Sequence, residues 1–459
     1  MIVVMRRITA LGTSHSNRLV TRSLAAQRAH ATEDIWRRQH IIDWAALGYI
    51  LVIASGALGW LDIIYYGATS AGRIVEVSPY NRIVWPLAYL LFGWLTLRRW
   101  PDVLDAAIRT WWVLLVPVVA VLSVLWSIEP VTSANAALRL AMSAVIGLYI
   151  GATFGLRGIA RAVFWVLMAT VGLSVLVVVL GLDFAIMFDG KARGIFYHKN
   201  QLGNRGLLLI VAALVLWIVS KRASCAFVGI VLGMLTLGLA QSATSLAAAT
   251  AGVAAVFGIL ALRADGLVVA FRLALLGAVL ALGGAFLYMA GVDPMSLILN
   301  LLDREPTMTG RSHLWEAAWG QIARRPLLGT GFEAFWASAM DWRTLRVLEL
   351  VGDVGSFHNT YLELWVNLGL LGLVTALITL VAMLKKSFSL ALEPEGLPAA
   401  WGFALMTSLM VSMLAEREIF LKHSFTGILM TATAVATVRA TDALASDRTL
   451  TRARIVRRQ

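Results

Sequence analysis

The chain has 459 residues, of which 59% are hydrophobic and only 14% are charged. Soluble domains carry about 25% charged residues, so this composition indicates a protein that crosses a membrane many times. It excludes a disordered, collagen-like or disulfide-built secreted chain, and the single cysteine, Cys225, can form no intrachain disulfide. The formal net charge of +13 would suit a nucleic-acid-binding protein, but its distribution along the chain argues otherwise.

The chain begins with a basic, polar arm over residues 1–43. Its opening apolar stretch is too short for the core of a signal peptide, so we expect the arm to stay in the cytoplasm. Twelve apolar runs follow, most of them close to the ~20 residues that a membrane-spanning helix needs. They cover residues 44–66, 83–97, 111–127, 134–155, 162–182, 202–219, 224–240, 243–262, 267–290, 361–384, 398–414 and 419–438. The sequence therefore predicts an all-α polytopic membrane protein of about 12 transmembrane helices with a basic tail over residues 439–459.

Lysines and arginines are unevenly distributed between the predicted loops, and cytoplasmic loops are those that carry them in excess. With the amino terminus inside, the cytoplasmic tails and loops hold 23 of the 39, the outer loops hold 12 and the predicted spans hold 4. We therefore expect both termini in the cytoplasm. The positive net charge then reflects topology and contact with anionic lipids rather than nucleic acid.

Two outer segments, residues 183–201 and 291–360, are longer than a minimal connection. A loop as long as the second is usually functional or disordered. Within it, one face of a predicted helix is apolar: Leu314, Trp315, Ala318, Trp319 and Ile322. The sequence Arg324-Arg325-Pro326 ends that pattern. A helix lying on the membrane surface with an aromatic belt explains the same pattern equally well.

Cations within the predicted spans are the strongest functional signal, because each costs several kcal/mol unless it is paired or reaches the interface. Arg139, Arg205 and Lys422 lie about one turn inside the outer face. Snorkelling accounts for Arg272 near the cytoplasmic end, and could account for each outer cation singly. Three loop cations are expected just above the outer ones: Lys191, Arg193 and Lys199. The whole set favours an anion site at the outer leaflet, which a lipid-linked diphosphate would fit.

The pair His358-Asn359 stands at the outer mouth of the 361–384 span. Nine residues after Asn359 comes Gly369-Leu370-Leu371-Gly372. The two glycines share a helix face and would let a neighbouring helix approach closely, which would fix the height of the histidine above the membrane. An imidazole, whose unperturbed pKa is about 6.5, can take a proton from a sugar hydroxyl at neutral pH. A loop histidine taken alone is more often simply solvated, and for His198, next to Lys199, contact with a ligand and simple solvation are equally good interpretations.

Other chemistries find little support. The sequence has no Asp-x-Asp pair, phosphate loop, zinc-binding spacing or Gly-x-Ser-x-Gly elbow. We therefore expect neither a metal ion nor a cofactor. Outer-loop carboxylates are better interpreted as ion-pair partners of loop arginines than as acid–base pairs: Asp303, Glu305, Glu316, Glu333, Asp341, Glu349 and Asp353.

Three blocks resemble the signature of O-antigen ligases and their polymerase relatives. They are His-Asn-x9-Gly-x-x-Gly at 358–372, Gly310-Arg311-Ser312-His313-Leu314-Trp315 with Arg325-Pro326-Leu327-Leu328-Gly329-Thr330-Gly331-Phe332, and Arg193-Gly194-Ile195-Phe196-Tyr197-His198-Lys199-Asn200. Lys199 before Asn200, and Ala334-Phe335-Trp336, are similar to exopolysaccharide-production members of this superfamily. The blocks cover about 70 residues, and the order and number of spans match over nearly the whole chain.

The resemblance implies a GT-C-like membrane glycosyltransferase at the periplasmic face of the bacterial inner membrane. Such an enzyme moves a glycan from undecaprenyl diphosphate to an acceptor hydroxyl without metal or nucleotide. Carried over by position, Arg193 and Arg311 would bind the diphosphate and stabilise it as leaving group, and His358 would activate the acceptor. The cations Lys199, Arg205, Arg139 and Lys422 would join the diphosphate site. Motif residues with structural roles would be Asn200, Asn359, Gly369 and Gly372, and Glu416-Arg417-Glu418 is a further candidate for lining the site.

The acceptor separates two versions of this reaction. A polymerase would use another lipid-linked glycan, and a ligase would use lipid A core. The segments Tyr197-His198-Lys199-Asn200 and Glu333-Ala334-Phe335-Trp336 favour the polymerase. A flippase for the same lipid is the rival from another class, but transporters usually show repeated halves, which this sequence lacks. Expected partners are the two glycans, membrane lipids and other membrane proteins of polysaccharide assembly.

Overall fold

The computed structural model describes residues 40–66, 78–220, 223–263, 309–338 and 355–456, together with Gly277. Residues 40–49 are helical and belong to a unit separate from the one that starts at Ile50 and contains the elements named below. Within the described residues the named elements are all helices, and an isolated β-bridge joins Ile186 and Ala192. The prediction of an all-α fold is confirmed for this part of the chain.

Seven described helices are long and apolar enough to cross a membrane, or nine if each of two bent pairs forms one span. The seven are α7 (Pro130–Thr153), α8 (Leu156–Val179), α9 (Lys199–Ser220), α10 (Ala223–Ala240), α11 (Ala243–Leu262), α16 (Thr360–Leu392) and α18 (Phe425–Val456). The bent pairs are His40–Ala54 with Gly59–Tyr65, and Trp100–Arg109 with Trp111–Leu125. Most of the arm at 1–43, the span expected at 267–290 and much of 291–360 lie outside the described residues.

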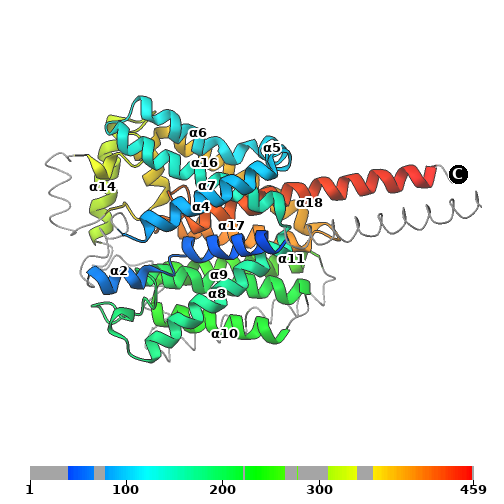
Figure 1. The fold of residues 1–459 in the computed structure, drawn as a ribbon, viewed down its shortest axis with the longest axis horizontal. Helices are drawn as coiled ribbons and strands as arrows, with labels where there is room; N and C mark the ends of the chain where they lie inside the picture. Colours follow the sequence, from blue (N-terminus) through cyan, green and yellow to red (C-terminus); the bar gives the residue numbers. More distant parts are fainter. Residues whose placement is uncertain are drawn as a thin grey trace, which may run out of the picture. The chain divides into compact units, whose positions relative to one another are not determined.

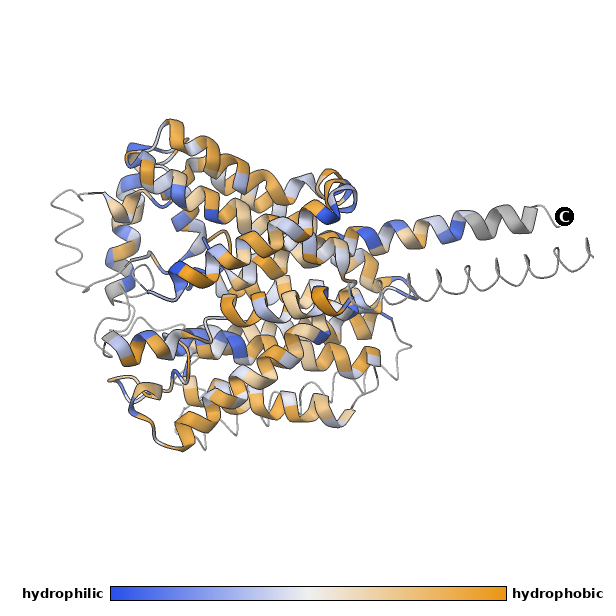
Figure 2. Cartoon of the chain, in the orientation of Figure 1, coloured by the Kyte–Doolittle hydropathy of each residue, from blue (hydrophilic) through white to orange (hydrophobic). Residues whose placement is uncertain are grey.

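Small residues bring the helices together. Helix α9 packs against α8, α10 and α11, and is buried along most of its length (Figure 1). Helix α18 packs against α7, where a Cβ atom added at Gly147 would lie 2.6 Å from the Cβ of Thr431. Such close approach of backbones is how helices associate in membranes, where the hydrophobic effect does not drive their contact. Figure 2 shows apolar residues along these helices and hydrophilic ones along the far part of α18.

The shorter elements correspond to several of the predicted spans. The bent helix α2 (Gly59–Tyr66) ends the first, and α4 (Asn81–Arg98) covers the second. The run at 111–127 is broken into η2 (Trp111–Leu114), α6 (Leu115–Leu122) and η3 (Ser123–Leu125), after the helix α5 (Trp100–Arg109). The run at 398–414 becomes η7 (Leu397–Ala399) and α17 (Ala400–Ser412). The remaining short turns are η4 (Asp183–Ala185) and η6 (Phe335–Ala337).

The predicted span at 419–438 begins too early. Residues 413–424 form an irregular segment, here called the 413–424 loop, and α18 starts at Phe425. The hydroxyl of Ser424 accepts a hydrogen bond from the Gly427 N–H, which caps the first turn of α18. Lys422 therefore lies on a loop and not inside a span, and the prediction of its depth in a helix was wrong.

Helix α16 is broken at Gly369, whose φ of 67° is left-handed. The segment 326–332 packs against this break and satisfies its backbone groups: Leu370 N–H donates to Pro326 O at 2.8 Å, and Gly331 N–H donates to Asn367 O at 2.9 Å. A Cβ atom at Gly369 would lie 2.2 Å from the Leu327 carbonyl carbon. The prediction that Gly369 and Gly372 share a helix face for a neighbouring helix was therefore wrong, because the irregular segment 326–332 makes the close approach at Gly369.

Helix α14 (Thr309–Arg324) confirms the helix predicted in the long outer segment, including its end at Arg324. Leu314, Ala318 and Ile322 are buried in a cluster with residues from the start of α16, whereas Trp319 is 52% exposed. The apolar face of α14 therefore mostly packs on the protein.

Candidate functional site

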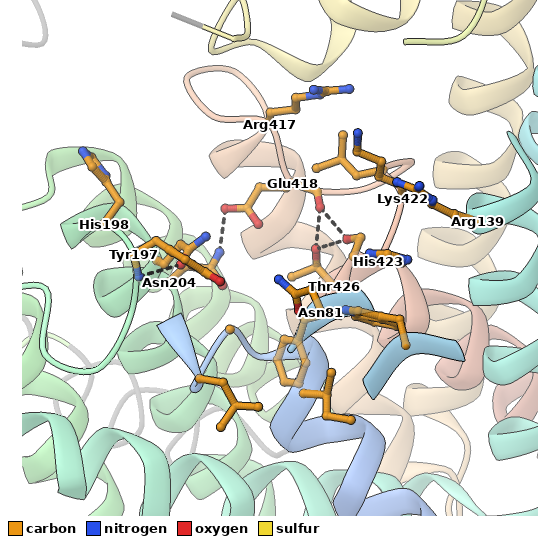
Figure 3. Close-up of a pocket in the computed structure, with 18 of the residues that line it drawn as sticks. Asn81, Arg139, Tyr197, His198, Asn204, Arg417, Glu418, Lys422, His423 and Thr426 are labelled. Carbon is orange, nitrogen blue, oxygen red and sulfur yellow. Dashed lines mark hydrogen bonds between the residues drawn. The ribbon is translucent and has the colours of Figure 1, made fainter. Parts of the chain in front are cut away.

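A cavity of about 690 Å³ opens among α4, α7, the start of α9, the start of α16 and the 413–424 loop (Figure 3). Five of the predicted site residues line it: Asn200, Arg139, Arg205, His358 and Lys422. The fold thus gathers residues from the two ends of the sequence around one space. The 413–424 loop contributes the largest continuous part of the lining, including Glu416-Arg417-Glu418.

Glu416 is the hub of one side of the cavity. Its Oε2 lies 3.5 Å from Nδ1 of His358. Its Oε1 accepts hydrogen bonds from Asn200 Nδ2 at 2.6 Å and from Arg311 Nη2 at 3.0 Å. These four residues are called the histidine–glutamate cluster below. The cluster holds an imidazole beside a carboxylate, an arrangement in which the carboxylate can orient the ring and stabilise its protonated form.

The backbone around His358 is held by aromatic packing. His358 itself has a φ of 49°, in the left-handed region that a non-glycine residue rarely adopts. The preceding residue, Phe357, is fully buried against Phe335 and Trp336. Its carbonyl accepts from Trp315 Nε1 at 3.0 Å, and its N–H donates to Glu363 Oε2 at 2.9 Å. These contacts fix where the imidazole projects.

Asn359 joins two parts of the site. Its Oδ1 accepts from the N–H groups of Tyr361 and Leu362 at 3.0 and 3.1 Å, so it caps α16. Its Nδ2 donates to Leu414 O at 3.0 Å, and the neighbouring Thr360 hydroxyl donates to Glu416 O at 2.8 Å. The His-Asn pair therefore positions His358 at the head of α16 and Glu416 opposite it.

His198 is a second imidazole on this side of the cavity. Its Nδ1 accepts a hydrogen bond from the Asn200 N–H at 3.2 Å, so a neutral ring carries its proton on Nε2. Burial lowers the pKa of His198, a shift that Glu416 opposes. His198 is therefore neutral near pH 7 and can donate one hydrogen bond from Nε2.

Glu418 is half-buried, and in the sequence it was only a general candidate for lining the site. Its Oε1 accepts from Asn204 Nδ2 at 2.7 Å and from the Ser412 hydroxyl at 2.9 Å. Burial raises the pKa of Glu418 to about 7, although Arg205 opposes that shift. Arg205 donates to Ser55 O at 3.0 Å and to Asn204 Oδ1 at 2.6 Å, so part of its donor capacity is already used within the protein.

Three predicted diphosphate residues lie outside the cavity lining: Arg311, which borders it through Glu416, and the two cations Arg193 and Lys199. Arg193 is 2% exposed and donates from Nε to Phe184 O at 2.7 Å. Lys199 Nζ lies 2.9 Å from Asp189 Oδ2. Burial alone would raise the pKa of Asp189, but Lys199 and Lys191 together lower it to about 2. Both cations therefore stabilise the 183–198 segment in this structure.

Arg417 connects the 413–424 loop to the segment before α16. It forms an ion pair with Glu333, and its Nε lies 3.9 Å from Glu363 Oε1. Glu363 also accepts from Trp336 Nε1 at 2.9 Å. The interpretation of Glu333 as an ion-pair partner is confirmed. The contact of Glu363 with Arg417 was not predicted, because the position of a carboxylate within an apolar run does not indicate which arginine it contacts.

The contacts of Tyr197 with Tyr80 and Asp62 were not predicted from the sequence. Tyr197 donates to Asp62 Oδ2 at 2.6 Å, and the hydroxyls of Tyr197 and Tyr80 are 2.5 Å apart. Because Tyr197 gives its proton to Asp62, Tyr80 must donate to Tyr197 and keeps its own lone pairs. Tyr80 therefore presents an acceptor at the cavity, and nothing in the sequence indicated that these distant residues meet.

Comparison with known proteins gives two matches. Residues 228–377 match a family model described as O-antigen ligase, a range that includes Arg311, His358, Asn359 and Gly369. The chain is also 27% identical over 314 residues to the exopolysaccharide production protein ExoQ of Rhizobium meliloti (strain 1021), a match over 62% of this chain and 68% of that relative. Its apolar helices make the chain an integral membrane protein, and it is similar to proteins described by O-antigen ligation and exopolysaccharide production. The resemblance predicted from the motifs, to the O-antigen ligase and polymerase family with its exopolysaccharide-production members, is confirmed.

Proposed function

We propose that the chain is a glycosyltransferase that moves a glycan from undecaprenyl diphosphate to an acceptor sugar hydroxyl, polymerising exopolysaccharide or O-antigen repeat units. The observation that carries the proposal is the contact of His358 with Glu416 in a cavity that is also lined by Arg139 and Lys422. A base beside an orienting carboxylate suits activation of a hydroxyl, and cations suit a phosphate leaving group.

The histidine–glutamate cluster supplies the base. With the Nδ1 proton directed at Glu416, Nε2 of His358 carries the lone pair that takes the acceptor's proton. The acceptor oxygen then bonds to the anomeric carbon while the bond from that carbon to the diphosphate oxygen breaks, and the diphosphate leaves with the electron pair. Glu416 stabilises the imidazolium that forms. A single displacement of this kind inverts the anomeric carbon.

The diphosphate needs positive charge at the leaving oxygen. Of the residues predicted for this role, Arg139, Arg205 and Lys422 line the cavity, and Arg311 borders it through Glu416. Arg193 and Lys199 are retained in the proposal as residues that would reach the diphosphate only if the 183–198 segment moved. We further propose that this site faces the periplasm from the inner membrane, with both termini in the cytoplasm.

The exopolysaccharide-production relative favours a polymerase, whose acceptor is another lipid-linked glycan. The second candidate is an O-antigen ligase with lipid A core as acceptor, which the description of the family model favours. Both reactions would use the same base and the same leaving group. Acceptor choice therefore decides between them.

Turnover by purified protein tests the proposal. Protein in liposomes is supplied with lipid-linked repeat units, and chain growth is followed by gel electrophoresis. His358→Ala should lower the rate by about 10²–10⁴, because a general base is lost. The matched control is His313→Ala, since His313 is exposed on α14 and lies 4.0 Å from Glu316. Equal rates for His358→Ala and wild type would overturn the catalytic role of His358.

A further inference from the structure

The side of the cavity formed by α4, α7 and the end of the 413–424 loop is positively charged. Burial lowers the pKa of His423 to about 3, and the positive charges of Arg139 and Lys422 contribute to the same shift. His423 stacks on Trp85 with ring centroids 3.9 Å apart and planes 5° from parallel. Figure 3 shows Arg139, Lys422 and His423 together on one side of the pocket and His198 on the other.

Two polar atoms on this cationic side have no hydrogen-bond partner within the described part of the chain. They are the Tyr89 hydroxyl and Nε2 of His423, and both are buried. Tyr89 and His423 pack together, with ring centroids 5.9 Å apart, and both residues line the cavity. A buried donor without a partner lowers the stability of a folded protein, so each such group is expected to bind a ligand, an ion or a water molecule.

Different charged groups act on the imidazoles of His198 and His423. The charged groups that act on His198 are Glu416, Lys199, His358 and Asp189. Those that act on His423 are Arg139 and Lys422, and the two sets have no member in common. On the first side Arg311 is paired with Glu416 at 3.0 Å, so its charge is largely balanced there. Arg139, by contrast, is exposed, and the structure gives it no ion pair with a described residue.

We propose that Arg139, Lys422, His423 and Tyr89 form an anion-binding subsite, distinct from the histidine–glutamate cluster, for an acidic group of the lipid-linked glycan. Arginine and lysine supply charge, and the imidazole and phenol supply hydrogen-bond donors, a set that suits phosphate or carboxylate oxygens. Holding an acidic group on the side opposite His198 fixes how the substrate lies relative to His358. The naming of the substrate rests on the proposed function, whereas the anion binding can be measured without turnover.

Calorimetric titration of the purified full chain in detergent tests this subsite, with inorganic pyrophosphate and glucuronate as separate probes. At least one probe should bind, and Arg139→Gln and Lys422→Gln should each weaken its binding by about tenfold or more. Arg139→Lys, which keeps the charge, should recover part of the affinity. One variant serves as a control and should bind like wild type: Lys386→Gln, at an exposed cation of α16.

The two probes also separate the sources of the anion. Tighter binding of pyrophosphate identifies the carrier phosphates, and tighter binding of glucuronate identifies an acidic sugar. Binding of neither probe, or binding that is lost in Arg311→Ala and kept in Arg139→Gln, overturns the subsite. If either of these binding results is found and the protein in liposomes still transfers glycan, the proposed function stands. Binding that depends on Arg139, without any transfer, would instead remove the proposed function.

Discussion

Glu416 Oε2 lies 3.5 Å from His358 Nδ1, and its other oxygen is held by Asn200 and Arg311. His358 lies in the loop before α16, and Glu416 lies in the loop after α17. Capping of α16 by Asn359, and the bonds from Asn359 and Thr360 to the 413–424 loop, bring them together. The candidate base is therefore oriented by the same contacts that join these loops.

Glu416→Gln tests the role of that carboxylate. The glutamine can still accept from Asn200, but it removes the negative charge beside His358. The rate of glycan transfer should fall by about tenfold to a hundredfold, within the range that general base catalysis contributes. Liposome assays measure the rate. Glu316→Gln is the control, because Glu316 is exposed on α14, and a wild-type rate for Glu416→Gln would show that the carboxylate does not assist the base.

Arg311 is expected to act through Glu416. Arg311→Ala should slow transfer in the wild-type background and have much less effect in the Glu416→Gln background. The two changes should fall short of additivity by roughly 1 kcal/mol, as is usual for residues in direct contact. Rates from the four proteins of this cycle give the coupling. Additive effects would mean that Arg311 contacts the substrate independently of Glu416.

Glu418 should make stability depend on pH. Burial raises its pKa from 4.5 to about 7, so the folded protein binds more protons than the unfolded chain between these values. The free energy of unfolding therefore falls as pH rises through this window, by up to roughly 3 kcal/mol. Glu418→Gln keeps an acceptor for Asn204 and Ser412 and does not titrate.

Thermal unfolding in detergent at pH 5 and pH 8 checks this expectation. Glu418→Gln should match wild type at pH 5 and unfold at a higher temperature at pH 8. A variant that is less stable than wild type at pH 8 would show that the ionised carboxylate is the stabilising form.

Gly369→Ala tests the break in α16. The left-handed φ and the 2.2 Å approach of Leu327 leave no room for a methyl group, so the variant should lose roughly 3 kcal/mol of stability or fail to fold. Gly93→Ala is the matched control, because nothing lies within 4 Å of its added Cβ on α4. That change should stabilise α4 by up to about 1 kcal/mol. Thermal unfolding of both variants gives the comparison, and equal midpoints would refute the close packing of residues 326–332 on α16.

Apolar runs predicted much of the fold. In a membrane no water is available to backbone N–H and C=O groups, so an apolar segment forms a helix in which these groups bond to one another. The prediction of α14 was confirmed because Leu314, Ala318 and Ile322 are spaced regularly along one face of the helix. Prediction from apolar runs failed where the chain forms irregular segments. The start of α18 was misplaced, since Ile419, Phe420 and Leu421 are apolar yet lie in the 413–424 loop, where Ile419 and Phe420 are buried.

Within the site, position along the chain identified His358, Arg139 and Lys422 as lining candidates. It could not identify partners. Glu416-Arg417-Glu418 was a candidate for lining the site, and only the folded chain shows that Glu416 contacts both His358 and Arg311. The sequence also does not show where an arginine side chain lies, as Arg193 illustrates, which is buried and donates from Nε to Phe184 O.

The leaflet on which lipid-linked repeat units accumulate in cells that carry His358→Ala tests glycan transfer most directly. Impermeant lectin labelling of intact spheroplasts distinguishes outer from inner units. The account predicts that single repeat units accumulate on the outer leaflet and that high-mass secreted polysaccharide is lost, because the donor is delivered but not consumed. Accumulation on the inner leaflet would contradict it and identify the protein as a flippase.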